Sequence, residues 1–236
     1  HEGDVLFMDN LLKTILEISK ADIVKFHLMV DIDEYFHKDH EAYEMAKKWM
    51  FSKTQWTKYI KKVKISGKQL MLLFNDIQSI EFGMSFKPEY VEIHSVCLND
   101  FNLLNALKNK LDIDTKVVLG VGGTSLYEIE NAINFLEHEN IVLMFGFQNY
   151  PTKYEDINFR KIKKIMSLYP KYKFGYADHT AWDHPNNEII TLLGAAQGMQ
   201  FVEKHITTHY GEKRIDWSAA ISVEKFNSIK DGMGIL

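Results

Sequence analysis

Short apolar runs of strand length alternate along this chain with amphipathic segments of helix length. Apolar runs of four to eight residues are typical of buried strands, and apolar residues three and four positions apart are typical of helices. Their alternation predicts parallel βα units, in which helices cover the sheet. The predicted strands are Asp22–His27, Gln69–Phe74, Tyr90–Ser95, Lys116–Val121, Ile141–Phe147, Lys173–Ala177 and Gln200–Lys204.

Three of the intervening helices have recognisable starts. Ser125 and Glu128 form a capping-box pattern ahead of residues that recur at helical spacing. Asp156 is expected to cap a second helix, and Asn99 or Asp100 a third. The residues expected to face the sheet are Leu126, Ile129, Ile133 and Leu136 on the first helix, Ile157, Ile162, Ile165 and Leu168 on the second, and Leu103, Leu104 and Leu107 on the third.

The length and composition favour one α/β domain. The chain has 236 residues, 46% of them hydrophobic, and no Pro/Gly-rich linker marks a boundary, so residues 1–236 are expected to form a single domain. Seven strands are one short of a (β/α)8 TIM barrel, and a strand before His1 would complete it. Residues 28–52 exceed a normal βα loop; they fit either a substrate lid or a surface excursion that packs its own aromatics.

Each of the last two predicted strands is followed by a histidine that has an acidic residue close before it. These pairs are Asp178 with His179 and Glu203 with His205. In a βα barrel the carboxyl ends of the strands meet at the catalytic face. Two neutral imidazoles one βα unit apart are a candidate pair of ligands for a divalent metal. The same pattern also fits two partly buried histidines bound to neighbouring carboxylates.

The charge balance excludes several classes of partner. Lys and Arg number 28 against 32 Asp and Glu, which gives a net charge of −4. Without a long basic run, we expect no nucleic acid and no membrane surface as a partner. The single cysteine, Cys97, excludes an intrachain disulfide, and no apolar stretch approaches the ~20 residues that span a bilayer. A cytoplasmic protein that acts on small molecules is the expectation.

Three ordered motifs carry a family resemblance. They are QNYPTKYED at residues 148–156, GYADHT at residues 175–180 and GMQFVEKH at residues 198–205. With HEGD at residues 1–4 and IVKFH at residues 23–27, the chain resembles the N-acetylneuraminate (sialic acid) synthase family, which includes other nonulosonic acid synthases and a spore-coat polysaccharide branch. The resemblance implies an eight-stranded barrel enzyme. Such an enzyme condenses phosphoenolpyruvate with an N-acetylated amino sugar, such as N-acetylmannosamine, and releases phosphate.

The resemblance also implies roles for individual residues. His179 and His205 would hold a divalent metal, manganese or magnesium. The other implied roles are catalysis for Glu2, Lys25 and Asp216, and substrate binding for Ser95, Gln148, Tyr150 and Lys204. Lys25 would lie beside phosphoenolpyruvate, and Glu2 beside the sugar. Full-length members usually carry a C-terminal antifreeze-like domain that covers the partner subunit's site; we expect that domain to be absent here, and a homodimer remains compatible with the chain.

Several positions depart from the family pattern where phosphoenolpyruvate should bind. Glu92 stands in place of a lysine and Cys97 in place of a carboxylate, while Leu73 and Ala177 replace hydroxyl donors. A carboxylate near a trianionic ligand opposes its binding, so poor turnover of phosphoenolpyruvate is expected. Two functions therefore stay open: a synthase, or a non-catalytic or altered-specificity paralogue that acts as a binding or assembly protein in surface polysaccharide biosynthesis. A third and weaker interpretation is an unrelated metal-dependent aldolase or hydrolase that shares only the barrel architecture.

Overall fold

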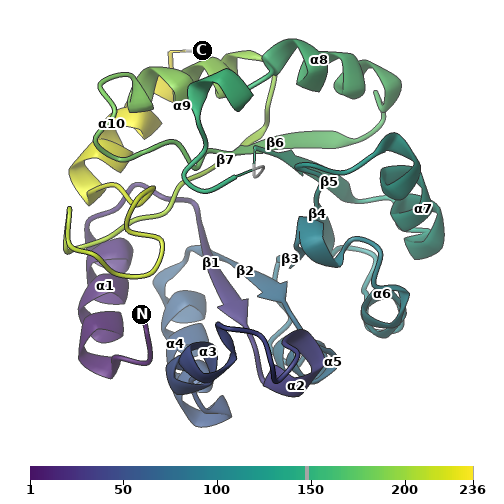
Figure 1. Ribbon diagram of the computed structural model, residues 1–236, viewed down its shortest axis with the longest axis vertical. Coiled ribbons are helices and arrows are strands. Elements are labelled where there is room, and N and C mark those ends of the chain that lie inside the picture. Colours follow the sequence, from purple (N-terminus) through teal and green to yellow (C-terminus); the bar gives the residue numbers. More distant parts are fainter. Residues whose placement is uncertain (147–148, 236) are drawn as a thin grey trace.

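A computed structural model describes residues 1–146 and 149–235 of the chain. Within these residues, seven parallel strands form one sheet whose spatial order follows the sequence from β1 to β7. Figure 1 shows that the sheet is curled and that the main helices lie on its outer side. The strands are β1 (Ile23–Leu28), β2 (Gln69–Phe74), β3 (Tyr90–Ile93), β4 (Lys116–Gly120), β5 (Ile141–Phe145), β6 (Lys173–Ala177) and β7 (Phe201–Glu203).

All seven predicted strands are present, and only their ends differ. The third ends at Ile93 because the His94 side chain accepts a hydrogen bond from the Val96 amide and starts a 3-10 helix. The fifth ends at Phe145, and the last part of the range predicted for it lies outside the described residues. β1 and β7 are the edges of the described sheet, so the fold is TIM-barrel-like, while the closed eight-stranded barrel stays a prediction.

The helices follow the strands in the order expected of βα units. None of those in the described residues is long and apolar enough to cross a membrane. The helices are α1 (Val5–Glu17), α2 (Ile32–Tyr35), α3 (Tyr43–Trp49), α4 (Lys53–Ser66), α5 (Ile77–Met84), η1 (Ser95–Cys97), α6 (Phe101–Lys108), α7 (Leu126–Leu136), η2 (Tyr154–Asp156), α8 (Phe159–Leu168), α9 (Asn187–Ala196) and α10 (Val223–Met233).

Two predicted helix starts are confirmed and one is wrong. The Ser125–Glu128 capping box begins α7, and the Asp100 carboxylate accepts the first amides of α6. Asp156 does not cap α8: it ends η2, the chain is extended at Ile157, and Asn158 supplies the cap by accepting from the Lys161 amide.

Two inward-facing expectations are also wrong, Leu126 on α7 and Leu168 at the end of α8, which is 51% exposed. Leu126 is 42% exposed, whereas Ile129, Ile133 and Leu136 are buried as predicted. Leu126 is the first residue of the helix, where the apolar face has not yet reached the sheet.

The sheet buries apolar residues on both sides. The larger core lies between the strands and the outer helices, and a smaller cluster around Met71, Tyr90 and Val118 fills the inner side. Because side chains alternate along a strand, Lys25 on β1, Glu92 on β3 and Glu203 on β7 share that inner side. The curled sheet thus carries a charged group on its concave face.

Residues 28–52 combine features of both interpretations. Ile32, Tyr43 and Ala46 pack together as a small separate cluster. Met45 and Trp49 of the same segment line the cavity at the strand ends. The segment therefore packs its own aromatics and also borders the site, and its action as a lid stays a prediction.

Candidate metal centre and substrate cavity

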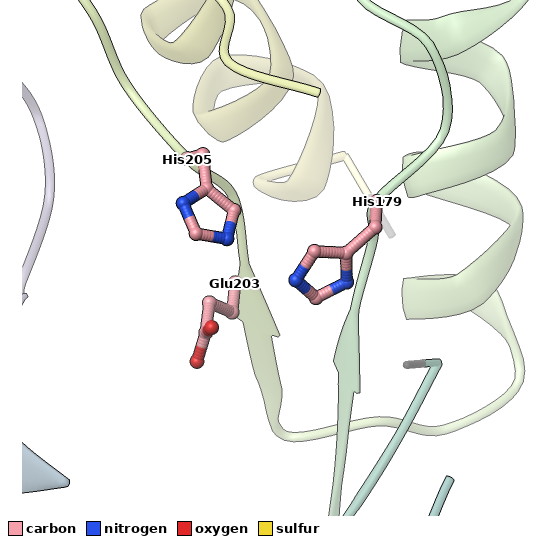
Figure 2. A group of neighbouring side chains, drawn as sticks. All are labelled: His179, Glu203 and His205. Atoms are coloured by element: carbon pink, nitrogen blue, oxygen red, sulfur yellow. The ribbon is translucent and has the colours of Figure 1, made fainter. Parts of the chain in front are cut away.

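The ends of β6 and β7 bring three ligating side chains together. Glu203 ends β7, and His205 follows two residues later, so both point to the same face. Ala177 pairs with Glu203 in the ladder, and continuing that register places His179 opposite His205. The two imidazole centroids are 5.0 Å apart, and the ligand atoms of all three residues lie within 4.8 Å of one another. Figure 2 shows His179 on one strand end and the other two side chains on the neighbouring one.

Each imidazole has a partner for its Nδ1 atom. Nδ1 of His179 lies 3.0 Å from the Ala177 carbonyl oxygen, which can only accept a hydrogen bond. Nδ1 of His205 lies 3.7 Å from a carboxylate oxygen of Asp216. The His179 contact favours the tautomer with the proton on Nδ1 and the lone pair on Nε2, which is the arrangement that orients a metal-binding histidine, whereas the 3.7 Å separation at His205 is longer than a hydrogen bond.

The electrostatics suit a divalent cation. Burial lowers the pKa of His179 to about 3 and lowers the pKa of His205, so both rings are neutral near pH 7. Burial alone would raise the pKa of Glu203, but the charge and hydrogen bond of Lys25 outweigh it and lower that pKa to about 2. Neutral imidazoles and an ionised carboxylate are the protonation states that metal binding requires. Of the two metals that the sequence resemblance implies, this mixed set of two imidazoles and one carboxylate fits manganese better than magnesium, which prefers oxygen ligands alone.

Lys25 lies between two carboxylates on the inner face. Its Nζ atom is 2.5 Å from Oε1 of Glu203 and 3.1 Å from Oε2 of Glu92. Burial works against the ammonium, but the two carboxylates outweigh it and raise the pKa of Lys25. Burial raises the pKa of Glu92 to about 7, and Lys25 opposes that rise. Glu92 is thus one of the partners of the Lys25 ammonium, the group that the family resemblance places beside phosphoenolpyruvate.

Glu2, Tyr150 and Asp216 lie around the imidazole pair. Glu2 accepts hydrogen bonds from Arg214 Nη1 at 3.3 Å and from the Ile215 amide at 2.7 Å. It thereby holds the segment that carries Asp216. The Tyr150 hydroxyl donates to the Asp216 carbonyl oxygen.

The Tyr150 ring faces both imidazoles. Its centroid is 5.9 Å from that of His179 and 6.4 Å from that of His205. The structure therefore brings Glu2, Tyr150 and Asp216 to the predicted centre, while their roles in chemistry stay predictions.

Two other predicted site residues are not brought there. Lys204 is among the residues that line the cavity, but its side chain has no exposed surface and its ammonium pairs with Asp178 at 3.0 Å, on the side away from the two histidines. Ser95 opens η1 and is not among the described residues that line the cavity. Gln148 lies outside the described residues.

A cavity of about 690 Å³ lies beside these groups. The lining also includes Leu12 on α1, Asp22 before β1 and Ile229 on α10, so the volume covers the gap between the edge strands β1 and β7 as well as the site. Lys25, Glu203 and His205 line the cavity, as do two groups that the sequence did not assign to the site, His27 and Arg214. His27 stands two residues after Lys25 on β1, so strand alternation was the signal that could have found it. Arg214 carried no such signal because it lies in an irregular, highly charged loop.

The curled parallel sheet, with its side-chain cluster at the carboxyl ends of the strands, defines a TIM-barrel-like α/β protein. The chain belongs to the NeuB family, whose sequence profile matches residues 15–234. The family resemblance drawn from the motifs is thereby confirmed.

Two curated relatives align over nearly the whole chain. An N,N'-diacetyllegionaminic acid synthase of Campylobacter jejuni is 25% identical over 97% of this chain and 71% of its own length. An uncharacterized protein of Methanocaldococcus jannaschii is 25% identical over 100% of this chain and 68% of its own length.

Solved structures share the fold. An N-acetylneuraminic acid synthetase from Leptospira borgpetersenii, crystallised with citrate, has a TM-score of 0.87 and 22% identity, and the match covers 100% of this chain and 79% of that one. A spore coat polysaccharide biosynthesis protein of Bacillus subtilis has a TM-score of 0.82 and 18% identity, with coverage of 100% and 64%. A truncated 3-deoxy-D-arabino-heptulosonate 7-phosphate synthase from Thermotoga maritima has a TM-score of 0.74 and 9% identity, with coverage of 98% and 81%.

Proposed function

We propose that the protein is a metal-assisted synthase that joins phosphoenolpyruvate to an N-acetylated amino sugar in surface polysaccharide biosynthesis. The products would be a nonulosonic, sialic-type acid and phosphate. The observation that carries the proposal is the cluster of His179, Glu203 and His205 beside Lys25, in a chain of the NeuB family. The names of the Campylobacter and Leptospira proteins point to the same class of reaction.

The reaction places distinct demands on the two sides of the cavity. Carbon 3 of the enol attacks the open-chain aldehyde of the sugar, water adds to carbon 2, and phosphate leaves as its C–O bond breaks. A divalent metal held by His179, Glu203 and His205 would supply Lewis-acid polarisation of the aldehyde oxygen. Lys25 would supply a cation on the side of the anionic substrate, and the Tyr150 ring, which faces both imidazoles, would lie on the sugar side.

The proposal includes a closed (β/α)8 barrel formed by residues 1–236 with one further strand. Such a strand would pair with both β1 and β7, the parallel edge strands of the described sheet. A cytoplasmic location and a homodimer belong to the same proposal.

A second candidate function is supported by the pairing of Lys25. With Glu92 and Glu203 both bound to its Nζ atom, this ammonium already has two carboxylate partners before any ligand arrives. A phosphorylated substrate must compete with them. This arrangement favours a paralogue with altered specificity, or one that binds without catalysis, because function depends on the site and not on the fold.

Calorimetry with phosphoenolpyruvate in the presence of Mn²⁺ separates the two candidates. The synthase proposal expects saturable binding, followed by phosphate release when an N-acetylated hexosamine is added. Binding without phosphate release across a panel of such sugars would favour the second candidate. Absence of phosphoenolpyruvate binding, with Mn²⁺ binding intact, would reject the synthase.

A further inference from the structure

A buried ion pair lies directly behind the two histidines. Lys204 Nζ is 3.0 Å from Oδ2 of Asp178, and neither side chain has any exposed surface. Asp178 immediately precedes His179, and Lys204 immediately precedes His205. Since neighbouring residues of an extended chain point to opposite sides, the ion pair and the imidazole pair lie back to back across the same two strand ends.

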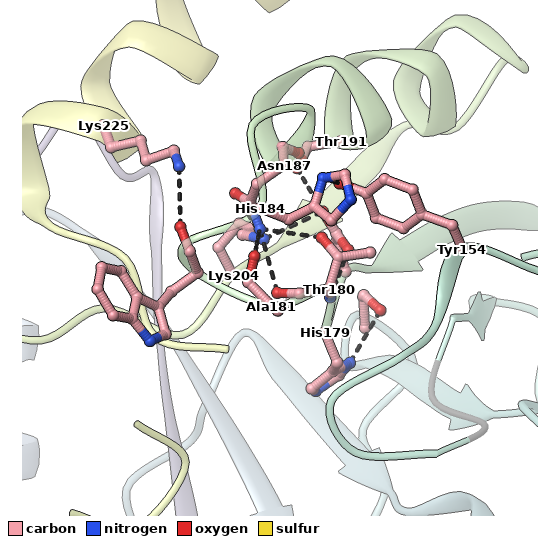
Figure 3. A network of polar contacts seen from close by, with 12 residues as sticks. Tyr154, His179, Thr180, Ala181, His184, Asn187, Thr191, Lys204 and Lys225 are labelled. Carbon is pink, nitrogen blue, oxygen red and sulfur yellow. Dashed lines mark hydrogen bonds and ion pairs between the residues drawn. The ribbon is translucent and has the colours of Figure 1, made fainter. Parts of the chain in front are cut away.

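Helix α9 satisfies the remaining polar atoms of this pair. Thr191 Oγ1 donates to Asp178 Oδ2 at 2.5 Å, and Asn187 Oδ1 accepts from Lys204 at 3.4 Å. Asn187 also donates to the Thr180 carbonyl oxygen at 3.1 Å. Figure 3 shows Asn187 and Thr191 on the helix, facing the segment that follows His179. The ion pair is therefore held in place by hydrogen bonds from helix α9 as well as by its own contact.

The regular ladder stops before the histidines. The last paired residues of β6 and β7 are Ala177 and Glu203, and one more backbone bond, from the Asp178 amide to the Glu203 carbonyl oxygen, follows at 3.0 Å. Beyond that point no ladder pairing in the described residues connects the two strands, yet the rings still face each other at 5.0 Å. At this level the bond between Asp178 and Lys204 joins the two strand ends directly, and Asn187 bridges Lys204 to Thr180.

We propose that Asp178 and Lys204 are positioning residues that set the affinity of the metal centre by fixing His179 relative to His205. A slip of one strand end against the other would change the angle that the two Nε2 atoms form at a bound metal ion. The ion pair opposes that slip. Outer partners that orient metal ligands typically change metal affinity ~10–100-fold when they are removed. This inference rests on the proposed metal-binding function. It also gives Lys204 a structural role in place of contact with substrate.

The test compares Lys204→Met with the double variant Asp178→Asn/Lys204→Met, measured by Mn²⁺ calorimetry and by thermal unfolding. Lys204→Met leaves a buried carboxylate unpaired and should lower the melting temperature. The double variant removes both charges and should recover stability. Its Mn²⁺ affinity should nevertheless stay ~10–100-fold below that of the unmodified chain, because no ion pair holds the strand ends. If the single variant does not fold, the Mn²⁺ affinity of the double variant alone tests the inference.

A destabilised control separates positioning from stability. Leu104→Ala in α6 removes a buried side chain distant in sequence from the site and should lower the melting temperature with Mn²⁺ affinity unchanged. A double variant that binds Mn²⁺ as tightly as the unmodified chain would overturn the inference. If the unmodified chain binds no Mn²⁺, the proposed function fails separately. A crystal structure of the double variant then decides the inference: retention of the 5.0 Å ring spacing overturns it, and a changed spacing supports it.

Discussion

Lys25 and Glu203 are joined by an ion pair of 2.5 Å, and the same Glu203 carboxylate belongs to the candidate metal cluster. One side chain therefore links the Lys25 cation to the candidate metal ligands. A metal that draws on Glu203 would weaken its hold on Lys25 and leave that ammonium more available to an anionic substrate. Metal and anionic substrate should accordingly bind with positive coupling, and linkage requires the coupling to be reciprocal.

Removal of either imidazole should abolish measurable Mn²⁺ binding. The unmodified chain should bind Mn²⁺ weakly, because three protein ligands leave the rest of the coordination sphere to water and substrate. His179→Ala or His205→Ala should weaken binding by more than the ~10–100-fold typical of an outer partner. Titration calorimetry measures the affinity. His40→Ala, at an exposed histidine, is the control that should bind as the unmodified chain does. Unchanged affinity in either test variant would show that its imidazole is structural.

Stability should fall with rising pH through the titration of Glu92. Burial raises the pKa of Glu92 to about 7 from its ordinary value of 4.5, although Lys25 opposes the rise. Between these values the folded chain binds more protons at Glu92 than the unfolded chain, so the stabilising effect is fully present below pH 4.5 and is lost as pH rises through about 7. Glu92→Gln removes this titration. The melting temperature of the unmodified chain should therefore drop more between pH 5 and pH 8 than that of the variant. Each kcal/mol of unfolding free energy lost corresponds to a drop of roughly 2–4 °C for a chain of this length.

Glu137→Gln is the matched control for that comparison. It removes one carboxylate that pairs with Lys108 at an exposed position, and the contact with Lys108 lowers the pKa of Glu137. Glu137 is thus ionised throughout the range from pH 5 to pH 8, and the control should keep the slope of the unmodified chain. Equal slopes for Glu92→Gln and the unmodified chain would contradict the raised pKa.

Gly194 should not tolerate a methyl group. A Cβ atom at this position of α9 would lie 2.3 Å from Cδ1 of Tyr176, which is 1% exposed and cannot move aside. Gly→Ala inside a helix normally stabilises by about 0.5–1 kcal/mol, but overpacking of this kind costs about 1–3 kcal/mol. Thermal melts of Gly194→Ala should show a net loss. Gly232→Ala meets the flexible Leu192 side chain at 3.1 Å and should lose less. A higher melting temperature for Gly194→Ala would show that α9 does not pack on β6 as described.

The strands could be predicted from sequence because their signal is local. Each is an apolar run bounded by polar residues, and pairing in sequence order follows from the βα alternation. The cap of α8 could not be fixed in the same way. Asp156 and Asn158 are both good caps, and the choice depends on where η2 ends, which the sequence pattern does not show.

The site was only partly accessible from sequence. Strand ends located His179 and His205, and the two-residue spacing of Glu203 and His205 already placed them on one face. The same alternation points Lys204 away from the site, which is why its resemblance-based role does not agree with its buried position. The contact of Lys25 with Glu92 joins residues 67 positions apart on strands that are not neighbours. Such a contact depends on the curl of the sheet, and no local pattern encodes it.

Glu92→Gln should strengthen the binding of phosphoenolpyruvate. Glu92 holds Lys25 at 3.1 Å, and an ionised carboxylate at that distance both occupies the ammonium and repels an incoming anion. Glutamine keeps the shape of the side chain and removes the charge, while Glu203 still positions Lys25. At pH 8 we expect binding to tighten about tenfold, or ~1.4 kcal/mol, in calorimetry with Mn²⁺ present.

Because burial raises the pKa of Glu92 to about 7, the carboxyl of the unmodified chain is mostly protonated at pH 6, and the advantage of the variant should shrink there. Glu137→Gln changes the net charge equally outside the cavity and should leave affinity unchanged at both pH values. Equal affinities of Glu92→Gln and the unmodified chain at pH 8 would show that Glu92 is not the obstacle to the anionic substrate.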